Sequence, residues 1–161
     1  MIRHVKIGLI VTVALWGLIG ALGNLLDWGQ ALGSVEAVTS MASFAGGPES
    51  WQATTNPIVV WLGALFIVIS KLTTGILCAA GAANMWQSRG GSAVDFNSAK
   101  ALGLAGCGVA VIMLFGGFIV IAESWFELWR SESGIRLALP DAFRYAGMIL
   151  LIAIFVVGAD E

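Results

Sequence analysis

Charged side chains inside long apolar stretches are the residues of this chain that could do chemistry. Lys71 is the only charge within Pro57–Trp86. Further along, Glu123 and Glu127 lie four residues apart, and Arg130 follows three residues later. At this spacing the three side chains would share one face of a helix. Ionisable groups within a bilayer are costly and tend to pair or to face a cavity, so these residues are candidates for a polar site.

Lys71 is expected to pair with Glu123, because a helical lysine points back toward the N-terminus of its helix. Asp27 and Arg144 are expected at the same level of the membrane. The candidate polar cluster therefore comprises Lys71, Glu123, Glu127, Arg130, Arg144 and Asp27. It could be a structural network that locks helices together, a ligand or partner site, or a proton or ion path. A single lysine without a carboxylate relay to the other face makes a poor conduit.

Several other chemistries do not fit the sequence. The only histidine is His4, which excludes a haem held by two histidines of one chain and a histidine-based zinc site. Cys78 and Cys107 lie in apolar segments without a CxxC motif and are predicted to be small buried residues. We expect no catalytic residues, no cofactor and no metal. The seven tryptophans could stack on a quinone, a pigment or a lipid, although interfacial belts are the commoner explanation.

The composition places these groups in a membrane. Of the 161 residues, 58% are hydrophobic and 11% are charged, whereas soluble domains carry about 25% charged residues. An apolar helix of about 20 residues crosses the hydrocarbon core. The sequence predicts an all-α, four-span transmembrane helix bundle that forms a single membrane domain over residues 1–161. The predicted spans cover about residues 6–26, 57–86, 99–129 and 142–157.

Local signals predict where helices begin and end. The first apolar stretch, Ile7–Leu26, is longer than the core of a signal peptide, so we interpret it as a retained span. Gly29 is a plausible stop for it, and Ser34–Met41 could form a short helix. Asn56-Pro57 is typical of a helix start. Asn97 or Ser98 is expected to cap the third span, and Pro140-Asp141 to begin the fourth.

Small residues at helical spacing predict where the spans pack, because they let helices approach closely in lipid. The predicted helix-packing residues are Gly17, Gly20, Gly75, Ala79, Gly103, Gly106 and Gly117. The stripe that contains Gly75, Ala79 and Ala83 is expected to face Gly103 and Gly106 across the polar hairpin of residues 87–100.

Lysine and arginine counts predict the orientation. With both termini in the cytoplasm, the inner side holds Arg3, Lys6, Arg89 and Lys100, and the outer side holds Arg130, Arg136 and Arg144. The first outer loop contains neither lysine nor arginine. The chain shows no basic run, so nucleic acid is not an expected partner.

Short segments throughout the chain resemble one bacterial family. They are Gly23-Asn24-Leu25-Leu26-Asp27, Asp95-Phe96-Asn97-Ser98-Ala99-Lys100, Glu123-Ser124-Trp125-Phe126, Trp129-Arg130-Ser131 and Ala142-Phe143-Arg144. The family comprises predicted small integral membrane proteins with a domain of unknown function. The resemblance implies four spans in the inner membrane and no assigned activity. The family tends to carry an acid in the middle of the second span, where this chain has Lys71.

These observations predict a non-enzymatic, multi-pass protein of the bacterial inner (plasma) membrane. The favoured function is an accessory or structural subunit of a larger membrane complex, respiratory or photosynthetic. The alternative is a small oligomeric transporter or channel that uses Lys71, Glu123 and Glu127. A weaker option is an enzyme that acts on a lipid or quinone through the outer carboxylates. The expected partners are the lipid bilayer and either a larger membrane-protein complex or further copies of the chain.

Overall fold

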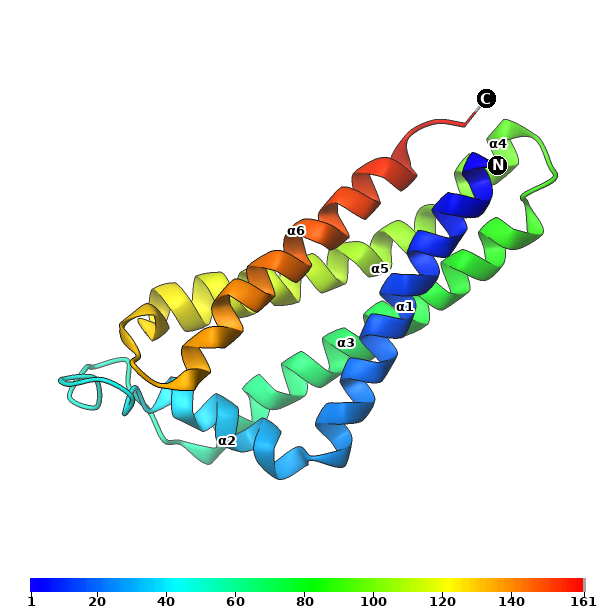
Figure 1. Cartoon of the computed structure of the whole chain (residues 1–161). Coiled ribbons are helices and arrows are strands. Elements are labelled where there is room, and N and C mark those ends of the chain that lie inside the picture. Colours follow the sequence, from blue (N-terminus) through cyan, green and yellow to red (C-terminus); the bar gives the residue numbers. More distant parts are fainter. Residues whose placement is uncertain (161) are drawn as a thin grey trace.

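Four long apolar helices form the molecule. The computed structural model describes residues 1–160, and within them every regular element is a helix (Figure 1). The helices long and apolar enough to cross a membrane cover Ile2–Leu26, Pro57–Gln87, Ala93–Trp125 and Gly134–Val157. The prediction of an all-α, four-span bundle is confirmed. Both termini lie at one end of the bundle, which we call the terminal end, and the opposite end is the loop end.

The first span ends at Asp27, where the chain turns sharply into a second helix. Helix α1 covers Ile2–Leu26 and α2 covers Trp28–Thr39. The carboxylate of Asp27 accepts a hydrogen bond from the backbone N–H of Gln30 at 3.1 Å and so caps α2. The stop expected at Gly29 therefore lies two residues too late, and the short helix expected over Ser34–Met41 exists but covers Trp28–Thr39. Asp27 is both the C-cap of the first helix and the N-cap of the second, because its side-chain acceptor can begin a new helix directly after the old one ends.

The second span begins as its sequence predicts. Helix α3 covers Pro57–Gln87, and the side chain of Asn56 accepts a hydrogen bond from the N–H of Ile58 at 2.9 Å. Pro57 occupies the first turn, where its missing N–H has no intrahelical partner to lose.

The third span is built from three consecutive helices. They are α4 (Ala93–Ala99), α5 (Ala101–Val111) and η1 (Ile112–Trp125). The side chain of Ser92 caps α4 by accepting from the N–H of Asp95 at 3.2 Å, so the cap expected at Asn97 or Ser98 lies too late. In η1 the backbone forms the wider π-helical turn, in which hydrogen bonds join residues five apart.

The fourth span follows the short turn η2 (Leu128–Arg130) and consists of η3 (Gly134–Leu137) and α6 (Ala138–Val157). The third span stops at Trp125 rather than near residue 129, because Glu127 adopts a left-handed backbone with φ of 50°. Helix α6 starts before Pro140, which is tolerated in the first turn.

Glycines set the two closest helix contacts. At Gly17 of α1, an added Cβ would lie 2.6 Å from the carbonyl oxygen of Lys71 and 2.8 Å from the backbone nitrogen of Gly75, so α1 and α3 touch backbone to backbone. Gly81 of α3 meets the backbone of Gly103 of α5 in the same way. The predicted partner of Gly75 is thus wrong, because Gly75 packs on α1 and not on α5.

Of the remaining predicted packing residues, the three glycines lie against a neighbouring helix and Ala79 does not. Gly106 lies against Cys78, and Gly117 lies against the ring of Phe66. Gly20 lies against the side chain of Lys71. Ala79 is exposed on the outside of α3 and does not serve the predicted packing role. The predicted stripe of Gly75, Ala79 and Ala83 is not the buried face of α3. The buried residues instead follow a spacing of three and four, from Gly75 through Cys78 to Ala82.

The middle of the bundle is closely filled. Ile10, Cys78, Cys107, Ala110 and Met113 have no exposed surface. The two cysteines are free thiols, and their predicted burial is confirmed.

Candidate functional site

A partly open chamber of about 670 Å³ lies near the loop end, between α1, α2, α3, η1 and the start of α6. Most of its wall is apolar, with Leu62 and Phe66 from α3 and Phe118 and Ile121 from η1. Its polar residues come mainly from the end of α1, from Asp27 and from α2, and α3 adds Lys71. These polar residues include Asn24, Asp27, Gln30, Ser34 and Lys71. The chamber therefore combines a mostly apolar wall with a few polar groups, most of them on the side of α1 and α2, which we call the polar edge.

Lys71 is the ammonium group in the chamber wall. Its Nζ donates to the Oδ1 of Asn24 at 3.4 Å, and its side chain is half-buried across Gly20. In residues 1–160 no carboxylate lies within 4 Å of this nitrogen, so the predicted pair with Glu123 is wrong. The lysine side chain reaches toward α1, whereas Glu123 lies on the widened helix η1, whose turns do not keep the expected register.

The other members of the predicted cluster lie apart from Lys71. Glu127 pairs with Arg130 at 2.6 Å, and Arg144 pairs with Asp141 at 3.1 Å on the surface. Glu123 is half-buried, and no ion pair or hydrogen bond of its side chain is found in the described chain. Glu123 and Glu127 do not share a helical face, since the helix ends between them. Of the six predicted residues, only Lys71 and Asp27 line the chamber.

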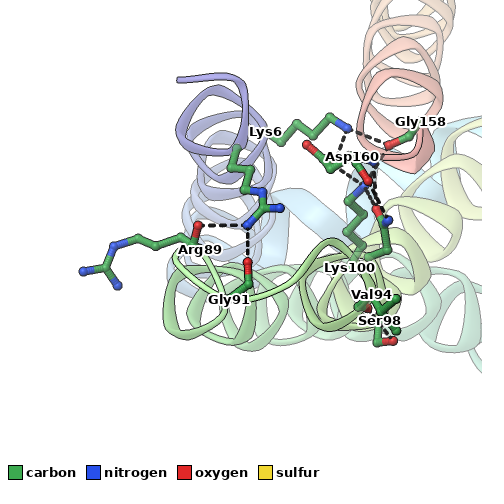
Figure 2. Close-up of polar contacts among 10 residues, drawn as sticks. Lys6, Arg89, Gly91, Val94, Ser98, Lys100, Gly158 and Asp160 are labelled. Atoms are coloured by element: carbon green, nitrogen blue, oxygen red, sulfur yellow. Dashed lines mark hydrogen bonds and ion pairs between the residues drawn. The ribbon is translucent and has the colours of Figure 1, made fainter.

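A second polar cluster, which was not predicted from the sequence, lies at the terminal end. Lys6 of α1 and Lys100, between α4 and α5, both contact the Oδ2 of Asp160, at 2.7 Å and 2.5 Å (Figure 2). Both ammonium groups also donate to the carbonyl oxygen of Gly158. Asn97 completes the cluster, which we call the clasp: Lys6, Asn97, Lys100, Gly158 and Asp160.

Asn97 holds the tail by its backbone. Its side-chain Nδ2 donates to the carbonyl oxygen of Asp160 at 3.2 Å, and its Oδ1 accepts from the N–H of Asp160 at 3.1 Å. The same Oδ1 accepts from the Nζ of Lys100 at 2.6 Å. The clasp therefore ties the chain beyond α6 to the first and third spans at once.

The clasp is buried and electrostatically unbalanced. The side chains of Lys6, Lys100 and Asp160 are 4%, 3% and 2% exposed, and two ammonium groups share one carboxylate. Burial alone would raise the pKa of Asp160, but the hydrogen bonds and charges of Lys100 and Lys6 outweigh it and lower that pKa below its usual value. The Oδ1 of Asp160 is buried without a hydrogen-bond partner in the described chain.

The sequence signal for the clasp was present but ambiguous. Lys6 and Lys100 lie near the ends of apolar segments, where lysines usually indicate the orientation in the membrane. Asp160 lies in a short polar tail. Only the return of α6 to the start of α1 brings these residues together (Figure 1). The spacing of Asn97 and Lys100, three residues apart on one helical turn, was the one local hint.

Nearby, Arg3 joins the N-terminus to the turn between α3 and α4. Its guanidinium donates to the carbonyl oxygens of Arg89 at 3.1 Å and Gly91 at 2.8 Å, as drawn in Figure 2. It also lies 4.9 Å from the centre of the Phe96 ring, at cation–π distance. Polar contacts therefore join the helices at the terminal end, whereas the chamber separates them near the loop end.

Among residues 1–160, no group of three or more histidine, cysteine, aspartate or glutamate side chains is arranged to hold a metal ion. A family model described as predicted small integral membrane protein (DUF2165) matches residues 2–158. No curated protein and no solved structure matches the chain.

Proposed function

The chain belongs to the DUF2165 family of predicted small integral membrane proteins, and we propose that it is an accessory subunit that holds an amphipathic molecule in the chamber. The resemblance to such a family, drawn from its short sequence segments, is confirmed. The larger complex that it serves would lie in the bacterial inner membrane, with both termini of the chain in the cytoplasm. The lysine and arginine count supports that orientation.

The chamber is the observation that carries the proposal. Its volume of about 670 Å³ falls within the range of small-molecule sites, which is roughly 300–1,000 Å³. A mostly apolar wall with a few polar groups at one edge is the usual build of such sites. One wall is the π-helical η1, and π-helical turns are frequent at functional sites.

Outward-facing glycines support the subunit part of the proposal. Gly108, Gly116 and Gly147 belong to the neighbouring elements α5, η1 and α6, and a Cβ added at any of them would meet no atom within 4 Å apart from the adjoining backbone of its own helix. A glycine in the middle of a helix lowers stability by about 0.5–1 kcal/mol relative to alanine. Because no close contact within this chain requires a glycine at these positions, packing within the chain does not explain them. Close approach of a helix from another membrane protein would explain them.

A transporter or channel is the second candidate, and the polar edge of the chamber favours it. In a single copy, a path from Lys71 to the terminal end would have to cross the closely filled middle of the bundle, including Cys107 and Met113. Flux would therefore need either that core to open or a path between copies. Ion or solute flux through the purified protein in vesicles would support this candidate over the accessory subunit.

The test is native mass spectrometry of the protein purified from its own membrane in a gentle detergent. We expect larger protein partners and a bound non-protein mass. The chamber variant Ala31→Phe should lose the small molecule, because the added ring occupies the space that the molecule fills. Ala83→Phe is the matched control, since Ala83 is exposed and absent from the chamber wall.

Two outcomes contradict the proposal separately. Recovery of the chain without protein partners removes the subunit part. An unchanged small-molecule mass in Ala31→Phe, with the control behaving in the same way, removes the chamber as its binding site.

A further inference from the structure

We propose that the molecule in the chamber is a single-chain amphiphile with an acidic head, and that Lys71 and Asn24 bind this head. The inference rests on the proposed function and adds the chemical class of the ligand. An acidic head on one hydrocarbon chain is shared by free fatty acids and by single-chain lipid phosphates. The experiment below distinguishes these two sources.

Lys71 lacks the partners that its charge requires. An ammonium group has three N–H donors, and in residues 1–160 this one meets a single acceptor, Asn24 Oδ1, at the long distance of 3.4 Å. Lys71 lies half-buried within a membrane-spanning helix. Charged groups in that environment pair with an opposite charge or face a polar cavity. The free donors of Lys71 adjoin the chamber, so an anionic group inside it would complete the site.

Asn24 supplies a second donor to the same place. Its Oδ1 faces Lys71, and its amide NH₂ has no acceptor in the described chain. An ammonium and an amide side by side can each donate to one oxygen of a carboxylate or phosphate. Hydrogen bonds from a charged donor to an anion are about twice as strong as neutral ones.

The nearby carboxylate does not cancel this charge. Asp27 also lines the chamber, but it is exposed, caps α2 through Gln30, and lies beyond ion-pair distance of Lys71. Its hydrogen bond at the helix start holds it there. An acidic head next to Lys71 would therefore neutralise a charge that the chain itself leaves unpaired.

The apolar wall sets the rest of the ligand. Elsewhere in the lining, Phe66 of α3 and Phe118 and Ile121 of η1 contribute hydrocarbon and aromatic surface. A hydrocarbon chain is the complement of that wall, and the chamber volume is that of a small-molecule site rather than of an extended groove. The geometry points to a head at Lys71 and Asn24 and one chain along α3 and η1.

The experiment is a binding titration of the full chain in phosphatidylcholine nanodiscs. The probes are dodecanoate, dodecyl phosphate and dodecanol, which share one chain and differ in the head. We expect the neutral alcohol to bind at least about tenfold more weakly than the better anion, because a charge-assisted hydrogen bond is lost. The tighter of the two anions identifies the source, fatty acid or lipid phosphate.

Variants locate the charge preference. Lys71→Met replaces the charged side chain by an unbranched apolar one that is a single atom shorter and should abolish the preference for anions, whereas Lys71→Arg should keep it. Arg144→Met is the control, since Arg144 lies outside the chamber and is exposed in a surface ion pair. Thermal unfolding of each variant verifies that it is folded before its binding is compared.

Each result decides a different claim. Equal binding of dodecanol and the anions, unchanged in Lys71→Met, overturns the acidic head and leaves chamber binding intact. An anion preference that survives in Lys71→Met but disappears in Arg144→Met assigns the head to the surface and also overturns the inference. If no probe binds the wild-type chain, both this inference and the proposed binding function fail.

Discussion

Replacement of Asp160 by alanine is expected to destabilise the bundle by about 3–5 kcal/mol, which is the cost of leaving buried charges without their partner. The variant would leave Lys6 and Lys100 facing each other with no carboxylate between them. It would also remove the two ion pairs between the tail and the first and third spans, leaving the tail held only by its backbone hydrogen bonds to Asn97, Lys6 and Lys100. The measurement is the free energy of unfolding in detergent, followed by circular dichroism during titration with a denaturing detergent.

Two further variants separate the clasp from ordinary surface pairing. Asp141→Ala removes an exposed ion pair with Arg144 and should change stability by no more than about 1 kcal/mol. Lys6→Met leaves one ammonium and one carboxylate, a balanced pair, so its loss should be smaller than that of Asp160→Ala. Equal effects of Asp160→Ala and Asp141→Ala would show that the clasp does not hold the fold.

The pH dependence of the clasp follows from the lowered pKa of Asp160. A carboxyl whose pKa is lower in the folded chain stabilises the fold at pH values above its unfolded pKa of about 3.9. That contribution is lost as the pH falls through the lower folded pKa. Stability should therefore not depend on Asp160 titration between pH 5 and 8. Asp160→Asn should lack the part of the acid-induced loss of stability that comes from protonation of Asp160.

Replacement of Gly17 by valine is expected to separate α1 from α3 and to cost at least about 1–3 kcal/mol, the usual penalty for overpacking. The penalty should lie at the upper end or beyond, because the first new carbon would already meet the backbone of Lys71 and Gly75. Backbone cannot move aside as a flexible side chain can. The same unfolding titration measures the loss.

Gly8→Val is the matched control on the same helix. A Cβ at Gly8 would meet nothing within 4 Å, so valine there should lose little stability. Equal destabilisation by the two variants would mean that helix propensity, and not the close contact with α3, decides the effect.

Local signals in the sequence were sufficient for the architecture. The apolar stretches predicted the four spans, because the bilayer thickness fixes the length of a spanning helix. Asn56 and Pro57 predicted the start of α3 correctly, since cap and first-turn chemistry act within a few residues. Ser92 was missed as a cap, because the polar segment that follows it offers several equally good candidates.

The polar sites depended on geometry that a sequence does not carry. Lys71 turns to Asn24 and not to Glu123, because the third span widens into a π-helix that no residue pattern announces. Asp160 is 60 positions from Lys100 and 154 from Lys6 in the sequence, and only the path of α6 places it between them. The packing role given to Ala79 failed for a similar reason, since small residues mark a possible contact and not its direction.

The chamber is the basis of the functional account, and photo-crosslinking tests it most directly. A dodecanoate that carries a diazirine on its chain would be irradiated with the protein in phosphatidylcholine nanodiscs, and the labelled positions would be mapped by peptide mass spectrometry. We predict labels on half-buried chamber residues such as Ile67 and Phe118, competed by dodecanoate and absent in Ala31→Phe. Labels confined to outward-facing residues such as Ile76 and Leu151, unaffected by that variant, would contradict the account.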